Sequence, residues 1–557
     1  MRKGPCSTSR NGGQILVQAL RQNGVDQVYC VPGESYLPVL DALQGRADIR
    51  TIVTRHEGAA SNMGDAYGKL TGRPGVVFVT RGPGATHAAN GVHTAMQDAT
   101  PMILFIGQVA TETKEREGFQ EVDYRRMFGG LAKWATEVEH IARIPEIVSR
   151  AFACAMSGRK GPVVVALPED VLFGLAEVAD APPVRVAAPS PDAAAVDELA
   201  TLLASAKRPL VIVGGTGWTP AAQRDLKTFV SHFELPVAAS FRRQDVLDNR
   251  DPHYVGQLGL GVSPALAESV RQSDLLIVLG SRLSEITSGG YELIQPPRPV
   301  QCLVHVHVDA AELGRVYQAD LPIQAAAVPM ARGLAALPAP AACAWADWTR
   351  QARAAYLKHN TPVGRAEGQV GVEMSAVVAH LNEVLPDDAV LSNGAGNYTV
   401  WLHRFYRYRS LGTELAPTNG AMGYGFPAAI AAKLAEPART VVCFAGDGCF
   451  MMYPQELATA MQFGAAVIVL LVNNGMLGTI RMHQEREYPG RVSGTQLVNP
   501  DFVAFAHAFG AHAERVEHEA DFPAAFERAR ASGKAAVIEL VTDPLQLGPQ
   551  SRMQAQG

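Results

Sequence analysis

The segment from Gly446 to Asn474 reads GDGCFMMYPQELATAMQFGAAVIVLLVNN. One apolar run, Val441–Ala445, precedes it, and a second, Ala466–Val472, leads into the Asn-Asn pair at its end. A helical pattern separates the two runs, which predicts two parallel strands joined by a crossover helix. Because parallel strands place their carboxyl ends at one edge of a sheet, we expect Asp447 and Asn474 to converge there.

Two oxygen ligands at such an edge suit a hard divalent cation. Mg²⁺ takes about six oxygens in octahedral array, usually one or two carboxylates with phosphate oxygens and water. The Asp447 carboxylate and the Asn474 amide oxygen meet this need, and Gly446 and Gly448 let the backbone approach a phosphate because they lack a Cβ. The alternative is a helix cap and turn in an ordinary α/β domain, since Gly-Asp-Gly alone is common.

The Gly-Asp-Gly turn, the spacer Cys449–Val472 and the Asn pair together resemble the thiamine-diphosphate signature of one enzyme family. That family contains acetolactate synthase, pyruvate decarboxylase, pyruvate oxidase and benzoylformate decarboxylase. The resemblance implies thiamine diphosphate and Mg²⁺ as cofactors, with the main-chain carbonyl of Met476 as a third metal ligand. It also implies that the residues around this turn bind the cofactor: Gly446, Gly448, Cys449, Met476 and Leu477.

At 557 residues the chain is too long for one hydrophobic core. Pro/Ala-rich stretches at 179–195 and 336–345 indicate linkers. Between them, short apolar runs alternate with helical patterns, which predicts α/β domains with doubly wound parallel sheets. The runs predicted as strands are 51–57, 75–80, 102–107, 162–167, 209–215, 236–240, 275–280, 303–309, 389–394, 440–445, 466–472 and 535–541. We expect three domains, at 10–178, 193–335 and 365–548. The resemblance implies that these are a pyrimidine-binding domain, a central Rossmann-like domain and a diphosphate/Mg-binding domain, respectively. The first and third are candidates for a shared fold without sequence similarity.

Composition excludes several classes of protein. The formal net charge of -5 gives no reason to expect nucleic acid as a partner. No stretch approaches the roughly 20 apolar residues of a membrane span, and the N-terminus lacks the apolar run of a secretory signal. The seven cysteines lack CxxC spacing, which fits a reducing cytoplasm better than a disulfide framework or zinc site: Cys6, Cys30, Cys154, Cys302, Cys343, Cys443 and Cys449.

In the first block, Glu57 follows the strand pattern Arg50–Thr54 and opens a helix of small residues. Burial disfavours the charged form of a carboxyl, so a desolvated Glu is available for proton exchange near neutral pH. The resemblance implies that Glu57 bonds N1′ of the cofactor's aminopyrimidine and so starts the chemistry. Alternatively, Glu57 interacts only with the helix dipole, an effect of at most about 1 kcal/mol.

Glu34 directly follows a Pro-Gly turn, where acetolactate synthases typically have Gly. A carboxyl at this point of the family site could relay protons and so favour aldehyde release or assist ligation. The alternative is an exposed turn residue. The resemblance also places several other residues of the first block in or near the active site: Pro32, Gly82, Asn90, Gln108, Phe119, Gln120 and Lys133.

In the third block, the run TNGAMGYGFPAAIAA resembles the family stretch that holds the aminopyrimidine. The resemblance implies that Gly420 and Met422 bind this ring and that the Met422 side chain enforces a bent cofactor shape, an orientation effect. The alternative is that Met422 fills the core. Asn397 and Tyr398 stand where acetolactate synthases have a Gln-His pair at the diphosphate.

The middle block departs most from the acetolactate synthase pattern. Ile286 replaces an Arg that anchors the acceptor's carboxylate in that group, and a buried charge-assisted bond contributes about 1.5–3 kcal/mol. His483 stands where the pattern has Trp in the acceptor pocket. The turn Gly-Gly-Thr-Gly at 214–217 is a weak nucleotide signal. Bound FAD and standard acetolactate formation are therefore both doubtful.

We therefore expect a thiamine-diphosphate enzyme that decarboxylates a 2-oxo acid such as pyruvate and ligates the product to a carbonyl acceptor. A simple decarboxylase that releases an aldehyde and a non-catalytic binding protein are alternatives. A nicotinamide-dependent dehydrogenase would need a ribose-binding acid, for which Asp225 and Glu234 lack a strand-end context. The family builds each site from two subunits, which implies a homodimer or homotetramer.

Overall fold

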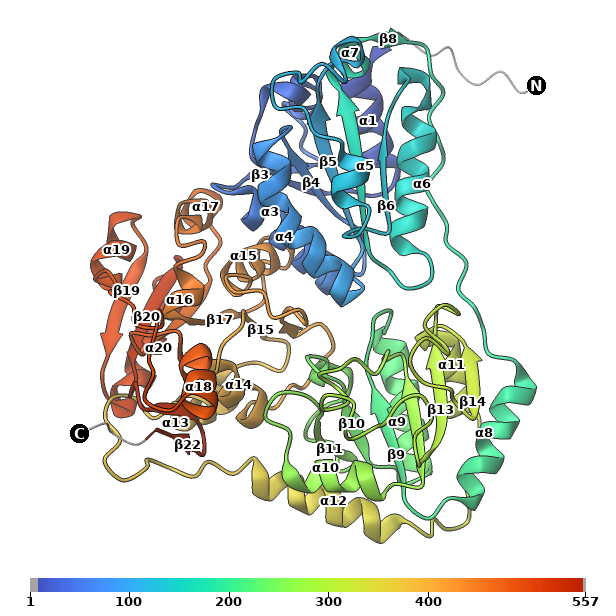
Figure 1. The fold of residues 1–557 in the computed structure, drawn as a ribbon, viewed down its shortest axis with the longest axis vertical. Coiled ribbons are helices and arrows are strands. Elements are labelled where there is room, and N and C mark those ends of the chain that lie inside the picture. The colour runs from blue at the N-terminus through green and yellow to red at the C-terminus, as the bar shows by residue number, and fades with distance from the viewer. Residues whose placement is uncertain (1–8, 554–557) are drawn as a thin grey trace. The chain divides into compact units, whose positions relative to one another are not determined.

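The computed structural model describes residues 9–553 and shows an α/β protein with three six-stranded parallel sheets (Figure 1). Cys6 lies outside the described residues. Contacts divide the chain into two compact units. The first contains the chain up to Ala187 with Phe426–Pro437 and Tyr453–Ala466, and the second contains the remainder.

The first sheet has the order β3-β2-β4-β5-β7-β6, with every neighbouring pair parallel. Helices α1 (Gly12–Gln22), α2 (Leu37–Leu43) and α6 (Ile144–Met156) share a core on one face, whereas α3 (Glu57–Thr71) and α4 (Pro83–Asp98) pack together. The strands are β2 (Gln27–Cys30), β3 (Arg50–Val53), β4 (Gly75–Val79), β5 (Met102–Gln108), β6 (Trp134–Glu137) and β7 (Pro162–Pro168).

The third sheet repeats this topology, with the order β16-β15-β17-β18-β20-β19 and all pairs parallel. Numbered along each domain, both sheets read 2-1-3-4-6-5, so the first and third domains share a strand order. Helices α13 (Met374–Val384), α14 (Tyr398–Phe405) and α20 (Phe522–Ala531) pack on its core. The strands are β15 (Val390–Asn393), β16 (Glu414–Leu415), β17 (Val441–Gly446), β18 (Ile468–Asn473), β19 (His512–Val516) and β20 (Ala536–Val541).

The central sheet has the order β11-β10-β9-β12-β13-β14, which is the 3-2-1-4-5-6 order of a Rossmann fold. Successive side chains of β9 pack into two different hydrophobic cores. Val211 and Val213 belong to one core and Leu210 and Ile212 to the other, so both faces of the sheet are buried. The strands are β9 (Pro209–Val213), β10 (Val237–Ala239), β11 (Tyr254–Gln257), β12 (Leu275–Leu279), β13 (Cys302–His307) and β14 (Leu321–Gln324).

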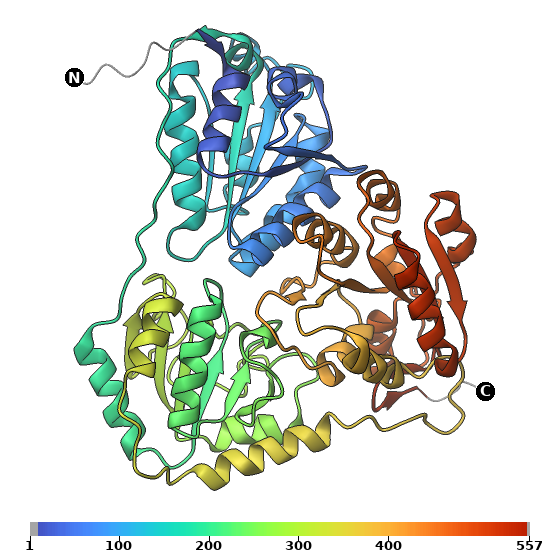
Figure 2. The ribbon, with the colours of Figure 1, turned by 180° about the vertical axis from the view of Figure 1, so that it is seen from behind.

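Helices cover both faces of this central sheet, as the two opposite views show (Figures 1 and 2). α9 (Pro220–His232) packs against α11 (Ala327–Ala335), and α10 (Pro264–Gln272) packs against α12 (Ala346–His359). α12 follows the Pro/Ala-rich stretch 336–345 and still belongs to the central core through Tyr356. The other stretch contains no helix or strand between Ala176 and α8 (Ala193–Ser205).

The chain contains further helices and strands. They are β1 (Arg10–Asn11), η1 (Glu34–Tyr36), η2 (Thr111–Thr113), α5 (Tyr124–Phe128), η3 (Ile141–Arg143), α7 (Glu169–Phe173), β8 (Leu175–Ala176), η4 (Gln244–Val246), α15 (Gly425–Ala435), α16 (Asp447–Phe450), α17 (Glu456–Phe463), α18 (Gly478–Glu487), α19 (Phe502–Ala508), η5 (Glu519–Asp521), β21 (Gln546–Gly548) and β22 (Ser551–Arg552).

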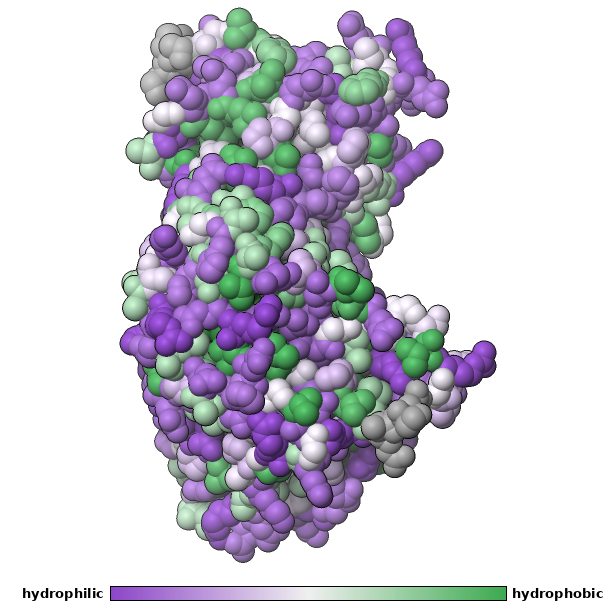
Figure 3. All heavy atoms as spheres, turned by 90° about the vertical axis from the view of Figure 1, so that its left-hand side faces the viewer, coloured by the Kyte–Doolittle hydropathy of each residue, from purple (hydrophilic) through white to green (hydrophobic). Residues whose placement is uncertain are grey.

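The surface is mixed in polarity. On the face drawn in Figure 3, hydrophilic side chains predominate and hydrophobic ones are interspersed among them. Within residues 9–553, none of the helices has the length and apolarity needed to cross a membrane.

Candidate cofactor site

Strands β17 and β18 bring Asp447 and the Asn pair to one edge of the third sheet, as the sequence predicted. The two strands are parallel neighbours, with Gly446 opposite Val472. The Asp447 carboxylate accepts a hydrogen bond of 3.0 Å from the Gly475 amide, directly after Asn474. The predicted convergence of the turn and the Asn pair is confirmed.

Asn499 also belongs to this cluster, although no sequence pattern indicated it. Its side-chain amide donates to Asp447 Oδ2 at 2.7 Å and to Asn473 Oδ1 at 3.1 Å. Asn499 lies in a loop with no fixed spacing from the Gly-Asp-Gly turn, so no pattern pointed to it. Burial raises the pKa of Asp447, and the bond from Asn499 opposes that rise.

A cavity of about 260 Å³ opens at this edge. It lies at the carboxyl ends of β15 and β17, where the strand order reverses and open α/β sheets usually bind ligands. Every residue that the sequence predicted for the third domain, except His483, lines it: Asn397, Tyr398, Gly420, Met422, Gly446, Asp447, Gly448, Cys449, Asn474, Met476 and Leu477. His483 is instead exposed on α18 and is not among the residues that form the cavity wall.

The cavity walls require the two glycines of the turn. A Cβ on Gly446 would lie 2.9 Å from the ring of Tyr398, and one on Gly448 would lie 2.8 Å from Leu477. Tyr398 is held in place, since its hydroxyl accepts a 3.2 Å bond from the Gly394 amide. The Cys449 thiol donates to the carbonyl of Ala395 at 2.7 Å and so joins the same wall.

The donor set at this edge fits a diphosphate and its metal ion. The Asp447 carboxylate, the Asn474 amide oxygen and the Met476 carbonyl are hard oxygen donors of the kind that Mg²⁺ prefers. The Asn474 oxygen also accepts the Met476 amide at 3.2 Å, which orders the turn that carries both groups. The buried Asp447 carboxylate favours a bound cation, because desolvation makes an uncompensated charge costly.

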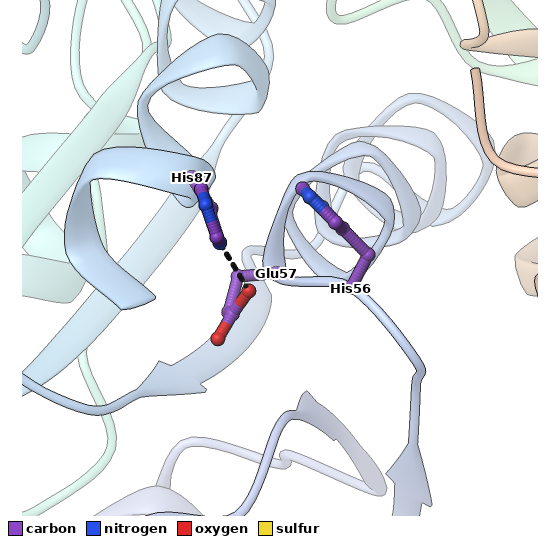
Figure 4. A group of neighbouring side chains, drawn as sticks. All are labelled: His56, Glu57 and His87. Atoms are coloured by element: carbon purple, nitrogen blue, oxygen red, sulfur yellow. Dashed lines mark hydrogen bonds and ion pairs between the residues drawn. The ribbon is translucent and has the colours of Figure 1, made fainter. Parts of the chain in front are cut away.

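The first unit contains the predicted activating acid. Glu57 is the first residue of α3, after the N-cap His56. Its side chain is 13% exposed, and its Oε2 lies 2.9 Å from Nδ1 of His87 on α4 (Figure 4). A Cβ on Gly84 would be 3.4 Å from the other carboxylate oxygen, so small residues keep that side open. Sequence reasoning missed His87, whose only signal is a titratable side chain one helical turn into α4.

His56, Glu57 and His87 lie close enough together to suggest a metal site. However, the two imidazole rings stack against each other, with centroids 4.6 Å apart and an interplanar angle of 26°. His56 Nδ1 already accepts the Gly58 amide at 2.9 Å. Burial, and then the neighbouring His87, lower the pKa of His56. We therefore interpret the trio as a hydrogen-bonded setting for Glu57.

Arg81, just after β4, connects several predicted residues of the first domain. Its guanidinium donates to the carbonyl of Phe119 at 3.1 Å, to Glu34 at 3.3 Å and to Glu169. The adjacent Gly82 has φ of +58°, and a Cβ there would lie 2.9 Å from Gln120. The structure thus brings Glu34, Phe119, Gly82 and Gln120 together, around an arginine that the sequence analysis did not single out.

The exposure of these groups differs. The Glu34 side chain is 66% exposed and that of Phe119 is 73% exposed, so neither is buried within the chain. Pro32 and Asn90 are also exposed. Gln108 is buried and donates to the Val122 carbonyl at 2.9 Å, which positions the loop that follows Gln120.

Lys133 has a structural explanation that the sequence analysis did not anticipate. Its ammonium donates to the carbonyls of Cys154 and Ser157, both at 2.7 Å, at the C-terminal end of α6. Cations near the last carbonyls of a helix stabilise it. Its assignment to the active site stays a prediction, and the contacts within this chain favour a role in the fold.

The glycine-rich turns of the central domain pack against each other. A Cβ on Gly214 would lie 1.9 Å from the Ser240 hydroxyl, and one on Gly215 would lie 2.0 Å from the Gly280 carbonyl. The Trp218 indole donates to the Gly214 carbonyl at 2.8 Å. Close packing of these turns explains the glycines without a nucleotide.

Comparison with known proteins places the chain in one family. Three family models of thiamine pyrophosphate enzyme domains match this chain. The N-terminal TPP binding domain matches residues 10–127, the central domain matches 196–334 and the C-terminal TPP binding domain matches 394–540. The acetolactate synthase large subunit of Parasynechococcus marenigrum is 33% identical over 516 residues, or 90% of this chain and 82% of that protein. The acetolactate synthase isozyme 2 large subunit of Escherichia coli is 30% identical over 520 residues, or 93% of both chains. The chain belongs to the thiamine pyrophosphate enzymes and is an acetolactate synthase-like enzyme.

Proposed function

We propose that this enzyme uses thiamine diphosphate and Mg²⁺ to decarboxylate a 2-oxo acid such as pyruvate and to ligate the product to a carbonyl acceptor. The observation that carries the proposal is the cavity of the third domain, where oxygen donors from the turn after β17 and from the Asn pair at the end of β18 meet. The names of the relatives, acetolactate synthases, support the same reaction class.

Each part of the site has a proposed task. Asp447, Asn474 and the Met476 carbonyl would hold Mg²⁺, while Gly446 and Gly448 would leave room for the diphosphate. When bound, thiamine diphosphate supplies the electron sink for loss of CO₂ from the 2-oxo acid.

The remaining residues orient the cofactor and move protons. Gly420 and Met422 would hold the aminopyrimidine, and Glu57 would exchange a proton with its N1′ nitrogen. Gln120, Phe119 and Glu34 would form the substrate side of the site.

We further propose an assembly in which Glu57 of one subunit and Asp447 of another serve one cofactor, in a dimer or tetramer. A cytoplasmic location is supported by the cysteines: within residues 9–553 all six are free thiols. A flavin-independent central domain is supported by the packing of Gly214 and Gly215 against neighbouring turns. An absorbance spectrum of the purified protein with a flavin band would contradict that last point.

A simple decarboxylase is the second candidate function. It is favoured by Glu34, an acid next to Arg81 at the predicted substrate side, and by Ile286, which cannot anchor an acceptor carboxylate. Product analysis with pyruvate, with and without an added aldehyde, separates the two candidates. Ligated 2-hydroxy ketone products would support the synthase-like reaction, whereas free acetaldehyde alone would support the decarboxylase. Absence of any CO₂ release from a panel of 2-oxo acids would contradict both.

A further inference from the structure

A buried acid outside the predicted catalytic set holds the turn from which Glu57 projects. Glu456, the first residue of α17, is 0% exposed. Its carboxylate accepts the Arg55 amide with both oxygens, at 3.0 and 3.3 Å, and it also accepts the His56 amide. The Thr459 hydroxyl donates to the same carboxylate at 2.6 Å. The acid therefore fixes the two residues immediately before Glu57.

Tyr453 strengthens this attachment from the same segment. Its ring lies 5.3 Å from the ring of His56, and a Cβ on Gly58 would come within 2.4 Å of its hydroxyl. Its hydroxyl also interacts with the side chain of Asn90 on α4. The start of α3 thus contacts two side chains of 453–456, and the absence of a side chain on Gly58 makes the approach of Tyr453 possible.

Contacts along the rest of α17 follow the same loop. Arg50 donates to the Phe463 carbonyl at 2.9 Å, and the Arg55 guanidinium donates to Gln462 at 2.6 Å. Thr459 reaches the Val53 carbonyl at 3.4 Å. α17 therefore lines the whole connection from β3 to α3, and Glu456 is its contact nearest to Glu57.

We propose that Glu456 is a positioning residue for Glu57. The Glu456 carboxylate fixes the backbone of the Arg55–Glu57 turn and so holds Glu57 in place. The proposal rests on the proposed role of Glu57 in proton exchange with the cofactor. A displacement of about 1 Å at a reacting group can reduce a rate by about 100-fold, so a loosened turn would slow activation without abolishing cofactor binding.

The arrangement depends on the ionisation of Glu456. Burial raises the pKa of Glu456 to about 7, while the bonds from Thr459, Arg55 and His56 oppose that rise. The other titratable groups that face it are the Arg55 guanidinium, His56, whose pKa burial lowers, and Tyr453, whose pKa burial raises. Above about pH 7 the Glu456 carboxylate accepts hydrogen bonds from all of these donors. Below that pH the protonated carboxyl accepts fewer hydrogen bonds, and the turn loosens.

The test uses the full-length enzyme with four variants: Glu456→Gln, Thr459→Val, Glu57→Gln and the exposed control Glu383→Gln on α13. Amide hydrogen exchange of the Arg55–Glu57 turn is measured without cofactor, and exchange of the C2 proton of bound thiamine diphosphate is measured as a function of pH. In Glu456→Gln we expect lower amide protection, C2 exchange slower by about tenfold or more, loss of the inflection near neutral pH, and unchanged cofactor affinity.

Thr459→Val removes a hydrogen bond that favours the carboxylate, so the inflection should move to higher pH while the turn stays protected above it. Glu383→Gln should match the wild type in every measurement. Wild-type protection and an unchanged pH profile in Glu456→Gln would overturn the proposal, as would a reduced thermal midpoint with no change in either. If Glu57→Gln also retained wild-type C2 exchange, the proposed function itself would fail, so the two failures are distinguishable.

Discussion

Replacing Gly446 with Ala tests the cavity with a single methyl group. Gly446 has φ of −67° and ψ of 156°, which any residue adopts, so the substitution adds no backbone strain. The new Cβ would lie 2.9 and 3.0 Å from two atoms of the Tyr398 ring, closer than carbon atoms pack. Because Tyr398 is 7% exposed and its hydroxyl bonds the Gly394 amide, the ring cannot withdraw freely.

Overpacking of this kind typically costs about 1–3 kcal/mol. If the strain is greatest when the cofactor fills the cavity, affinity for thiamine diphosphate falls by about 5- to 150-fold, at 1.4 kcal/mol per factor of ten. Titration calorimetry with Mg²⁺ present measures the affinity, and thermal unfolding measures the strain without cofactor. Gly130→Ala is the matched control, since a Cβ there meets no atom within 4 Å. Wild-type affinity together with a wild-type thermal midpoint in Gly446→Ala would refute the proposed geometry.

Three further substitutions separate binding from structure. Asp447→Asn should weaken Mg²⁺-dependent cofactor binding by about 10- to 150-fold, since a charge-assisted ligand contributes about 1.5–3 kcal/mol; wild-type cofactor affinity in the variant with Mg²⁺ present would contradict its role. Lys133→Met should lower the thermal midpoint and leave kcat unchanged because its ammonium bonds the end of α6; a loss of kcat alone would restore it to the active site. Arg81→Met should raise KM for the 2-oxo acid and lower the thermal midpoint, since Glu34 and Glu169 lose their partner; unchanged KM would separate Arg81 from the substrate side.

The strands that the sequence predicted are mainly those in the interior of the sheets. β4, β5, β9, β12, β17 and β18 have neighbours on both sides and read as continuous apolar runs, because helices cover both of their faces. β6, β11, β14, β16 and β19 escaped prediction, and each lies at the edge of its sheet. Edge strands are short and partly polar, so their sequences resemble loops. β2 is interior but was not predicted, because its sequence QVYC contains a single aliphatic residue, Val28.

The candidate site divides in the same way. Asp447 and Asn474 could be found because the crossover between two strands fixes their spacing, and the residues of the cavity wall followed from the family resemblance. Asn499, Arg81 and Glu456 could not, because their contacts join positions that no local pattern relates: Glu456 bonds a residue 401 positions away in the sequence. Only the folded chain brings such groups together.

The most direct test of the central claim is the exchange rate of the C2 proton of thiamine diphosphate bound to Glu57→Gln, measured by NMR beside the wild type. Proton transfer by a positioned side chain typically contributes about 10²- to 10⁴-fold. We predict that exchange slows by this amount while cofactor affinity changes little, because Asp447 and the cavity of the third domain remain intact. Exchange at the wild-type rate in Glu57→Gln would contradict the account.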